Sequence, residues 1–199
     1  FNNQHIQHLN FRGCDSLTAF SDNLCLLRER LTHLNLTKCK NFGVNSLQAT
    51  LEHVGNSLQY LEIRSCPDLF VNPNFDDDPG WNPIFSALLP LSNLKWLYLS
   101  LNQVSDQLVE SVLHQCPSLL TLELGKVQGL NKPRIVHDCL QNLYLDFTNI
   151  TENTVIECPR LEKLNISNVK CTVGDAWIAR AILQPVQSGT LKQLVVERC

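Results

Sequence analysis

LTHLNLTKCK, which spans residues 31–40, spaces its three leucines at intervals of three and two residues and places a cysteine three residues after the last. The apolar-x-x-Leu-x-apolar part of this stretch recurs along the chain, each time with a leucine at the fourth place. Eight such segments, called rows here, begin at Ile6, Leu31, Leu58, Leu94, Leu119, Leu140, Leu161 and Leu191. The steps between them are 25, 27, 36, 25, 21, 21 and 30 residues. Chance clustering of apolar residues would not keep that leucine in every row, so the chain is an internal repeat.

The spacing within a row predicts a short β-strand that is buried on one face only. Other residues alternate with the leucines, and a period of two places the two sets on opposite faces of a strand. No row could bury its leucines alone, so the rows must stack into a continuous ladder. We therefore predict an α/β leucine-rich repeat solenoid, or horseshoe, with a parallel sheet on the concave face and helices and short turns on the convex face. Residues 1–199 are expected to form a single domain of about eight repeats.

Between the rows the chain must return to the start of the next strand, and four return segments have apolar residues at helical spacing. The predicted helices cover residues 16–30, 45–57, 105–116 and 172–186. Ser105 with Asp106 fits the start of the third helix, and Pro185 is expected to close the fourth. The two 21-residue steps leave no room for a full helix, so extended backbone or short 3₁₀ turns are expected there. Residues 67–83 form an insertion whose Pro, Asn, Asp and Gly content indicates a surface loop.

The ninth place of each row is where the chain turns off the strand into the interior. It is occupied by Cys14, Cys39, Cys66, Asn102, Val127, Thr148, Val169 and Cys199. Small, largely apolar groups with a weak donor suit a buried bend, so we expect these cysteines to be inert packing groups. The chain has nine cysteines. It has no C-x-x-C and no zinc-finger spacing of cysteine and histidine, so no structural zinc site is predicted.

The cysteines at the ninth place, together with two C-P-x-L lead-ins, indicate a particular repeat subtype. The lead-ins are Cys116-Pro117-Ser118-Leu119 and Cys158-Pro159-Arg160-Leu161. In these features essentially the whole chain resembles the cysteine-containing leucine-rich repeats of F-box proteins. The resemblance implies the substrate-recognition part of a ubiquitin ligase, in which an F-box helps to dock an adaptor while the repeats hold the target. No stretch here looks like an F-box, so the adaptor would bind through a region outside this chain.

The third, fifth and seventh places of the rows point away from the leucines and form an open face, where we predict the partner-binding residues. All three tyrosines of the chain fall on this face, and Trp96 joins them. Aromatic residues and arginine dominate interface hot spots, and acidic neighbours would add charge of both signs. The predicted protein- or peptide-binding residues are Tyr60, Glu62, Arg64, Trp96, Tyr98, Glu123, Tyr144 and Asp146. The alternative interpretation is that the aromatic residues only cover the sheet.

Composition and motifs argue against other functions. The formal net charge is −3 with acids and bases mixed, which offers no basic field for nucleic acid and no cationic face for a membrane. The chain has no G-x-S-x-G, no phosphate-binding glycine loop and no H-E-x-x-H, so we do not expect an enzyme. His8 and His33 lack a carboxylate nearby in the pattern, and the acidic run 76–78 lacks EF-hand spacing. Neither a metal nor another cofactor is therefore predicted.

Two alternatives stay open. Three N-x-S/T sequons, at Asn35, Asn149 and Asn165, would suit an extracellular, receptor-like or secreted recognition domain. Cysteines that follow the buried turn instead favour a reduced, cytoplasmic or nuclear protein. The second alternative is a structural subunit of an assembly that uses its convex side or the 67–83 insertion. Neither end of the array shows a polar cap, so we expect capping repeats outside this chain.

Overall fold

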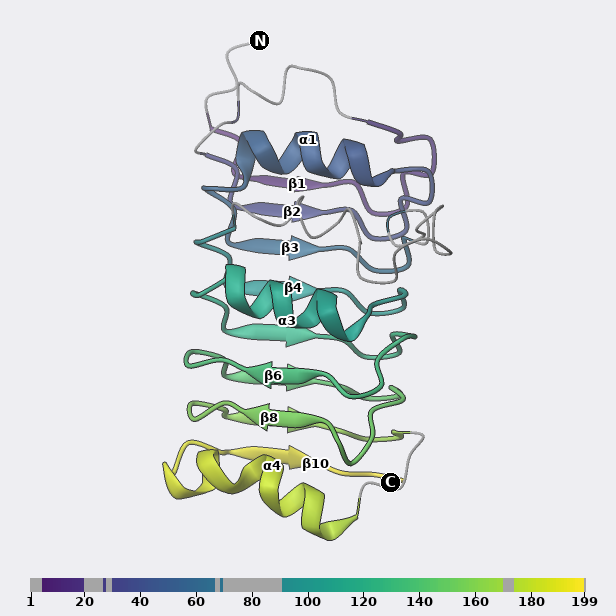
Figure 1. The fold of residues 1–199 in the computed structure, drawn as a ribbon. Helices are drawn as coiled ribbons and strands as arrows, with labels where there is room; N and C mark the ends of the chain where they lie inside the picture. Colours follow the sequence, from purple (N-terminus) through teal and green to yellow (C-terminus); the bar gives the residue numbers. More distant parts are fainter. Residues whose placement is uncertain are drawn as a thin grey trace.

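Eight short parallel strands, one from each row, form the sheet that organises the fold (Figure 1). The computed structural model describes residues 5–19, 27, 30–66, 69, 91–169 and 174–198. The strands of this sheet are β1 (His8–Asn10), β2 (His33–Asn35), β3 (Tyr60–Glu62), β4 (Trp96–Tyr98), β5 (Thr121–Glu123), β7 (Asn142–Tyr144), β9 (Lys163–Asn165) and β10 (Gln193–Val195). Each covers the third to fifth places of its row. The predicted α/β repeat solenoid is confirmed.

The strands pair in a register that aligns equal places of successive rows. Leu34 lies opposite Leu61, and Leu61 lies opposite Leu97. From β2 to β9 these fourth-place leucines have no exposed surface, and they form the centre of the core. Leu9 is only partly buried and Leu194 is 36% exposed, because β1 and β10 each have a paired strand on one side only.

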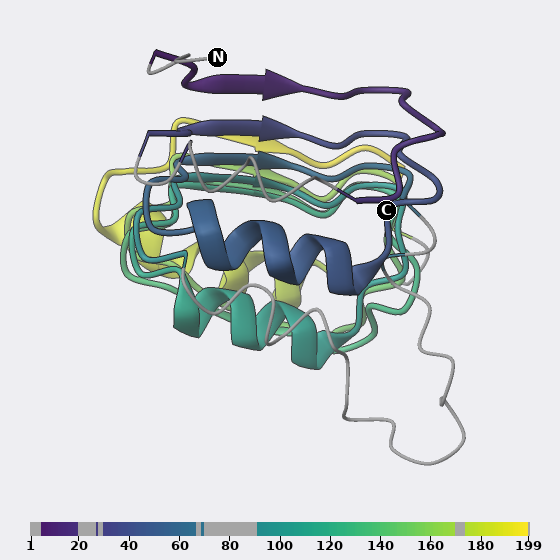
Figure 2. The same cartoon turned by 90° about the horizontal axis from the view of Figure 1, so that it is seen from above.

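Three described return segments are helical, and their helices cover the face of the sheet opposite the open face (Figure 2). They are α1 (Val44–Val54), α3 (Asp106–Gln115) and α4 (Asp175–Gln187). Ser105 caps α3 as predicted, because its Oγ accepts a hydrogen bond of 3.2 Å from the backbone N–H of Leu108. Among the described residues, no helix combines the length and the apolar character needed to cross a bilayer.

Two of the helix predictions need correction. The first described residues of the predicted helix 16–30 are not helical; most of the rest of that segment, like most of the 67–83 insertion, lies outside the described residues. Pro185 does not close α4, which continues beyond it. In the last turn a proline costs the helix only one N–H bond. Its carbonyl also accepts a hydrogen bond of 2.9 Å from the Thr190 N–H, which ties down the helix end.

The two 21-residue steps return through extended backbone, as their length predicts. β6 (Arg134–Val136) and β8 (Val155–Glu157) pair in parallel and form a small second sheet on the side of the helices. α3 packs beside β6, and α4 packs beside β8. On the helical side, β6 and β8 therefore lie between α3 and α4, where other steps carry a helix (Figure 1).

Ninth-place side chains tie successive rows together where the strands end. The thiol of Cys66 donates to the carbonyl of Leu36 at 3.0 Å, and Cys39 makes the equivalent bond to the first row. Asn102 does the same with its amide: Nδ2 donates to the carbonyl of Ile63 at 2.7 Å, while Oδ1 accepts from the backbone N–H of Cys66 at 2.9 Å. A donor at the ninth place thus satisfies a sixth-place carbonyl of the row before it.

The expectation of buried, unreactive ninth-place cysteines holds for the inner rows but is wrong for the first. Cys14 is exposed, because β1 has a row on one side only. Burial raises the pKa of the Cys66 thiol to about 11. Burial also raises the pKa values of the lead-in thiols Cys116 and Cys158 to about 12. Cys199 lies outside the described residues.

The eighth place of every row adopts a left-handed backbone conformation that the sequence pattern did not reveal. Gly13 is the only glycine in this column; the other seven are Lys38, Ser65, Leu101, Lys126, Phe147, Asn168 and Arg198, with φ between 54° and 64°. Such a conformation costs an L-residue about 1–2 kcal/mol. The stack over-determines it, because the N–H at this place donates to the seventh-place carbonyl of the next row, as from Phe147 to Ser167 at 2.9 Å.

Asn102→Ala should lower the free energy of unfolding by at least about 2 kcal/mol, because the Cys66 N–H and the Ile63 carbonyl lose their buried partner. Urea denaturation followed by circular dichroism measures the change. Asn149→Ala is the matched control, since Asn149 is exposed, and it should change stability by less than about 0.5 kcal/mol. Equal effects of the two substitutions would contradict the role of Asn102.

A short iodoacetamide pulse at pH 8 should alkylate Cys14 in the folded protein and leave Cys66, Cys116 and Cys158 unmodified. Only the thiolate reacts, and these three thiols combine burial with raised pKa values. Peptide mass spectrometry measures the alkylated fraction of each cysteine in the folded protein and in the protein denatured in urea. Modification of the buried thiols at the rate of Cys14 would show that the rows open readily.

Candidate protein-binding surface

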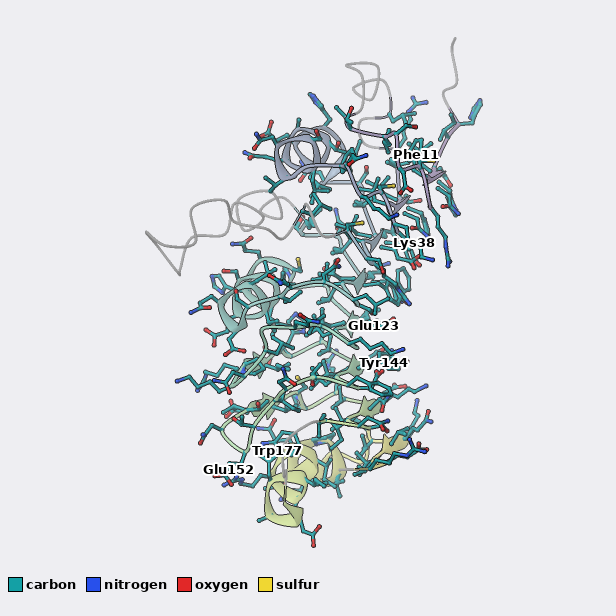
Figure 3. The ribbon with its side chains drawn as sticks, turned by 90° about the vertical axis from the view of Figure 1, so that its right-hand side faces the viewer. Phe11, Lys38, Glu123, Tyr144, Glu152 and Trp177 are labelled. Carbon is teal, nitrogen blue, oxygen red and sulfur yellow. The ribbon has the colours of Figure 1, made fainter. Side chains whose placement is uncertain are left out.

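The open face of the sheet carries the residues predicted to bind a partner. Figure 3 shows Glu123 and Tyr144 on the strand side of the molecule and Trp177 on the opposite, helical side. Because the register aligns equal places, side chains at the third, fifth and seventh places form columns that run across the strands. Neighbouring strands lie roughly 4.8 Å apart, so residues in one column can contact each other directly.

Three rings stack across the first three strands, and the Tyr98 ring of the fourth strand lies tilted against the third ring, Tyr60. The ring centroids of His8 and His33 are 3.9 Å apart, those of His33 and Tyr60 are 5.4 Å apart, and those of Tyr60 and Tyr98 are 5.2 Å apart. Burial and the charge of His8 lower the pKa of His33, which favours its neutral form. In the part of the chain that the structure describes, no three His, Cys, Asp or Glu side chains gather in a way that could hold a metal ion.

Arg64 bridges two carboxylates beside this stack. Its Nη2 donates to Glu123 Oε2 at 2.7 Å, and its Nε lies 3.0 Å from Glu62 Oε1 in an ionic contact without hydrogen-bond alignment. The guanidinium carbon also lies 4.9 Å from the centroid of the Tyr98 ring. Ser100 donates from its hydroxyl to Glu123 Oε1 at 2.5 Å. Every charged group in this cluster therefore has a partner supplied by the fold.

Glu62 serves to position its neighbours rather than to offer contact area, because it is only 8% exposed. Its Oε2 accepts hydrogen bonds of 2.7 Å from the Tyr60 hydroxyl and from the Asn35 side-chain amide. Burial and this bond to Glu62 raise the pKa of Tyr60, and burial together with Glu123 raises the pKa of Tyr98. Both phenols are neutral at physiological pH, and the hydrogen bond to Glu62 orients the Tyr60 side chain.

The face continues toward the C-terminal rows around Asp146. Gly125 occupies the same place, the seventh, in the preceding row. A Cβ atom on Gly125 would lie only 2.9 Å from Asp146 Oδ1. A side chain at position 125 would therefore displace the carboxylate. Asn165 donates from its amide to the same oxygen at 3.3 Å, and its Oδ1 accepts from the Ser167 N–H at 3.1 Å.

Lysine ammonium groups lie over the aromatic rings of this part of the face. The pairs, with the distance from Nζ to the ring centroid, are Lys95 and Trp96 (5.9 Å), Lys126 and Phe147 (5.2 Å), and Lys163 and Tyr144 (5.3 Å). Phe147 is 48% exposed. These cation–π contacts hold the lysine side chains against the face; Lys126 is exposed, and Lys95 and Lys163 are half-buried.

The structure joins five of the eight predicted site residues in one network: Tyr60, Glu62, Arg64, Tyr98 and Glu123. Trp96, Tyr144 and Asp146 lie on β4, β7 and the turn after β7, beside that network. Sequence reasoning missed the polar partners Asn35 and Ser100, although both stand at open-face places. It placed Phe147 just beyond the open face and did not single out Lys126; both occupy the eighth place, where the alternation of the strand has already ended.

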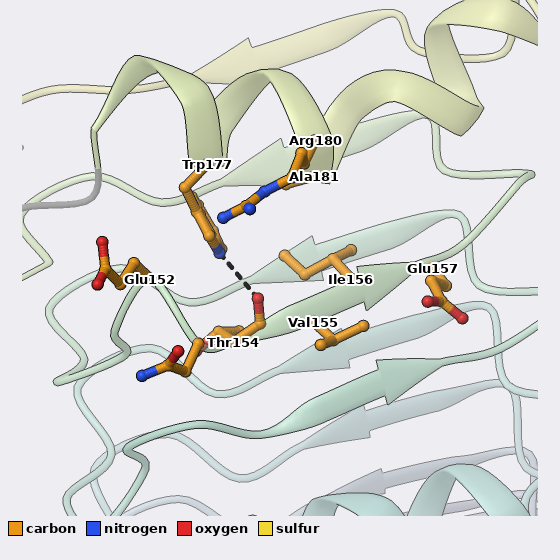
Figure 4. A pocket seen from close by; sticks show the side chains of 9 residues that line it. Glu152, Thr154, Val155, Ile156, Glu157, Trp177, Arg180 and Ala181 are labelled. Carbon is orange, nitrogen blue, oxygen red and sulfur yellow. Dashed lines mark hydrogen bonds between the residues drawn. The ribbon is translucent and has the colours of Figure 1, made fainter.

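A pocket of about 400 Å³ lies on the helical side, between β8 and α4 (Figure 4). Glu152, Glu157 and Arg180 are among its lining residues, and the buried Trp177 forms one wall. The Trp177 indole N–H donates to the carbonyl of Thr154 at 2.8 Å, so it has no donor left for a ligand.

Arg64→Ala should lower the free energy of unfolding by about 1–3 kcal/mol, because Glu62 and Glu123 would face each other without their shared cation. Glu123→Gln added to this variant should restore part of the loss by removing one of the two negative charges. Urea denaturation at pH 7 compares the three proteins. If Glu123→Gln lowers the free energy of unfolding further instead, repulsion between Glu62 and Glu123 is not the cause of the destabilisation by Arg64→Ala.

A family model described as FBD-associated F-box protein At5g56370, LRR repeats, matches residues 26–180. The match covers more than half of the chain and includes the second to seventh rows with their stacked strands. It agrees with the F-box type of repeat that the ninth-place cysteines and the C-P-x-L lead-ins indicate. The chain therefore belongs to the leucine-rich repeat family of FBD-associated F-box proteins.

Proposed function

We propose that this protein-interaction module binds a protein partner on its open face and supplies the substrate-recognition part of an F-box-type ubiquitin ligase. The target would lie across β3 to β7, over the eight predicted site residues. An adaptor would bind through a region outside this chain. On this proposal the chain catalyses no reaction itself and works in the cytoplasm or the nucleus.

The observation that carries the proposal is the fixed arrangement of half-buried rings on the open face. Tyr60 is held by Glu62, and Tyr98 lies under the Arg64 guanidinium. A surface whose aromatic side chains are already ordered loses little side-chain entropy when a partner covers them. Aromatic residues that merely shield a sheet would not need a network that reaches over four rows.

Two hydrogen-bonded asparagines support an intracellular reader over the extracellular alternative. Asn35 donates to Glu62, and Asn165 donates to Asp146, while the Oδ1 of each accepts a backbone N–H two residues further on. A glycan on either amide would break these bonds and cover the proposed binding face. Asn149 is exposed, so it is the one sequon whose glycosylation the face would tolerate.

Replacing Trp96 and Tyr144 together with alanine should weaken partner binding at least tenfold and leave the thermal transition nearly unchanged. Both rings are only partly buried, and the positioning network does not include them. Affinity capture from cells, with quantitative mass spectrometry, compares the variant with the unchanged protein. A protein that the unchanged chain captures and the variant does not capture would identify the open face as the binding surface.

The matched control replaces Arg134 and Val136, two exposed residues of β6 on the helical side, with alanine. It should capture the same partner as the unchanged protein. Loss of the partner with this control and not with the Trp96 and Tyr144 variant would move the function to the helical side. The structural-subunit alternative would then replace the proposed reader.

A further inference from the structure

We infer that the segment bound on the open face is acidic, with carboxylate side chains that pair with Lys95, Lys126 and Lys163 around the rings of the fourth to seventh rows. This inference rests on the proposed function and adds the chemical class of the partner. The three lysines and the rings that they cover, Trp96, Phe147 and Tyr144, are called the lysine–aromatic patch below.

The three ammonium groups of the lysine–aromatic patch offer a partner positive charge. In the described ranges, none of the three ammonium groups of the patch lies within ion-pair distance of a carboxylate; their recorded contacts are with the aromatic rings. Lys126 is exposed, and the other two lysines are half-buried. An ammonium group over a ring keeps its full charge and most of its hydration, so it can still pair with an incoming carboxylate.

Two carboxylates of the same face, Glu62 and Glu123, are already engaged, whereas Asp146 accepts a hydrogen bond of 3.3 Å from the Asn165 amide. Glu62 accepts from Tyr60 and Asn35, and Glu123 accepts from Ser100 and Arg64. A basic segment would have to break these bonds to pair with Glu62 or Glu123, whereas an acidic segment can pair with lysines that form no ion pair with the described residues. The protein has a formal net charge of −3, so this patch would also orient an acidic partner against the average charge of the molecule.

The spacing of the patch fits a short extended segment. Lys126 lies in the turn after β5, toward the other end of the strands. Lys95 directly precedes β4 and Lys163 begins β9, so these two lysines lie three strand steps, or roughly 14 Å, apart. At about 3.4 Å per residue, four to five extended residues cover that distance. Exposed apolar side chains lie at the rim, with Leu101 at 52% and Phe147 at 48% exposure. The segment should therefore combine acidic residues with one or two apolar ones.

Three fluorescein-labelled ten-residue peptides test the inference. They share two central leucines and differ in carrying glutamate, glutamine or lysine at the remaining places. In 50 mM salt the glutamate peptide should bind at least tenfold more tightly than the lysine peptide, as measured by fluorescence anisotropy. Its affinity should fall when the salt is raised to 300 mM, because screening weakens exposed ion pairs.

Charge reversal locates the site. Lys126→Glu combined with Lys163→Glu should weaken binding of the glutamate peptide at least tenfold. The matched control, Lys132→Glu combined with Arg180→Glu, makes the same change in net charge at exposed positions away from the patch and should leave the affinity within about twofold. Thermal melts verify that both variants fold.

Three results would overturn the inference: no binding of the glutamate peptide, tighter binding of the lysine peptide, or equal losses for the two charge-reversal variants. Partner capture separates this inference from the proposed function. If capture requires Trp96 and Tyr144 but survives reversal of the two lysines, the open face binds protein and the acidic character of the target is wrong. If neither variant affects capture, both ideas fail together.

Discussion

The structure depends on one constraint: a row cannot bury its leucines without a second row beside it. A strand of three residues has no stability alone, and its apolar face becomes a core only when the next row covers it. The ladder from Leu34 to Leu164 meets this requirement with one buried leucine per row. At the edge strand β10, which has a neighbour on one side only, Leu194 and Val196 remain more than one-third exposed.

Stacking the leucines fixes the positions of all the other columns. Because Leu61 must align with Leu97, Tyr60 aligns with Trp96 and Glu62 aligns with Tyr98. Arg64 and Glu123 are 59 residues apart in the chain, yet they form an ion pair across the rows. The left-handed turn at the eighth place follows from the same alignment, because each turn from the first to the seventh row is held by a carbonyl of the next row. The open face is thus built by the core beneath it.

The carboxylates and the lysine ammonium groups of the open face have different structural roles. Carboxylates such as Glu62 lie low on the face and hold rings and the Arg64 guanidinium in place. Lysines such as Lys126 stand at its edge and remain open to solvent. The sequence of the open face cannot distinguish these roles, because carboxylates and lysines occur in the same rows. Their contacts separate them, because Glu62 and Glu123 are paired within the face, whereas the lysine ammonium groups lie over aromatic rings.

The sequence by itself determined the rows, their strands, the α1 and α3 helices and the extended returns of the two short steps. These follow from the period of the leucines and from step length, which are local properties of the chain. It did not reveal the exposed Cys14, the passage of α4 beyond Pro185 or the left-handed column. Only the tertiary structure decided which open-face residues pair and which stay free, because those contacts join rows more than twenty residues apart and depend on side-chain reach and burial.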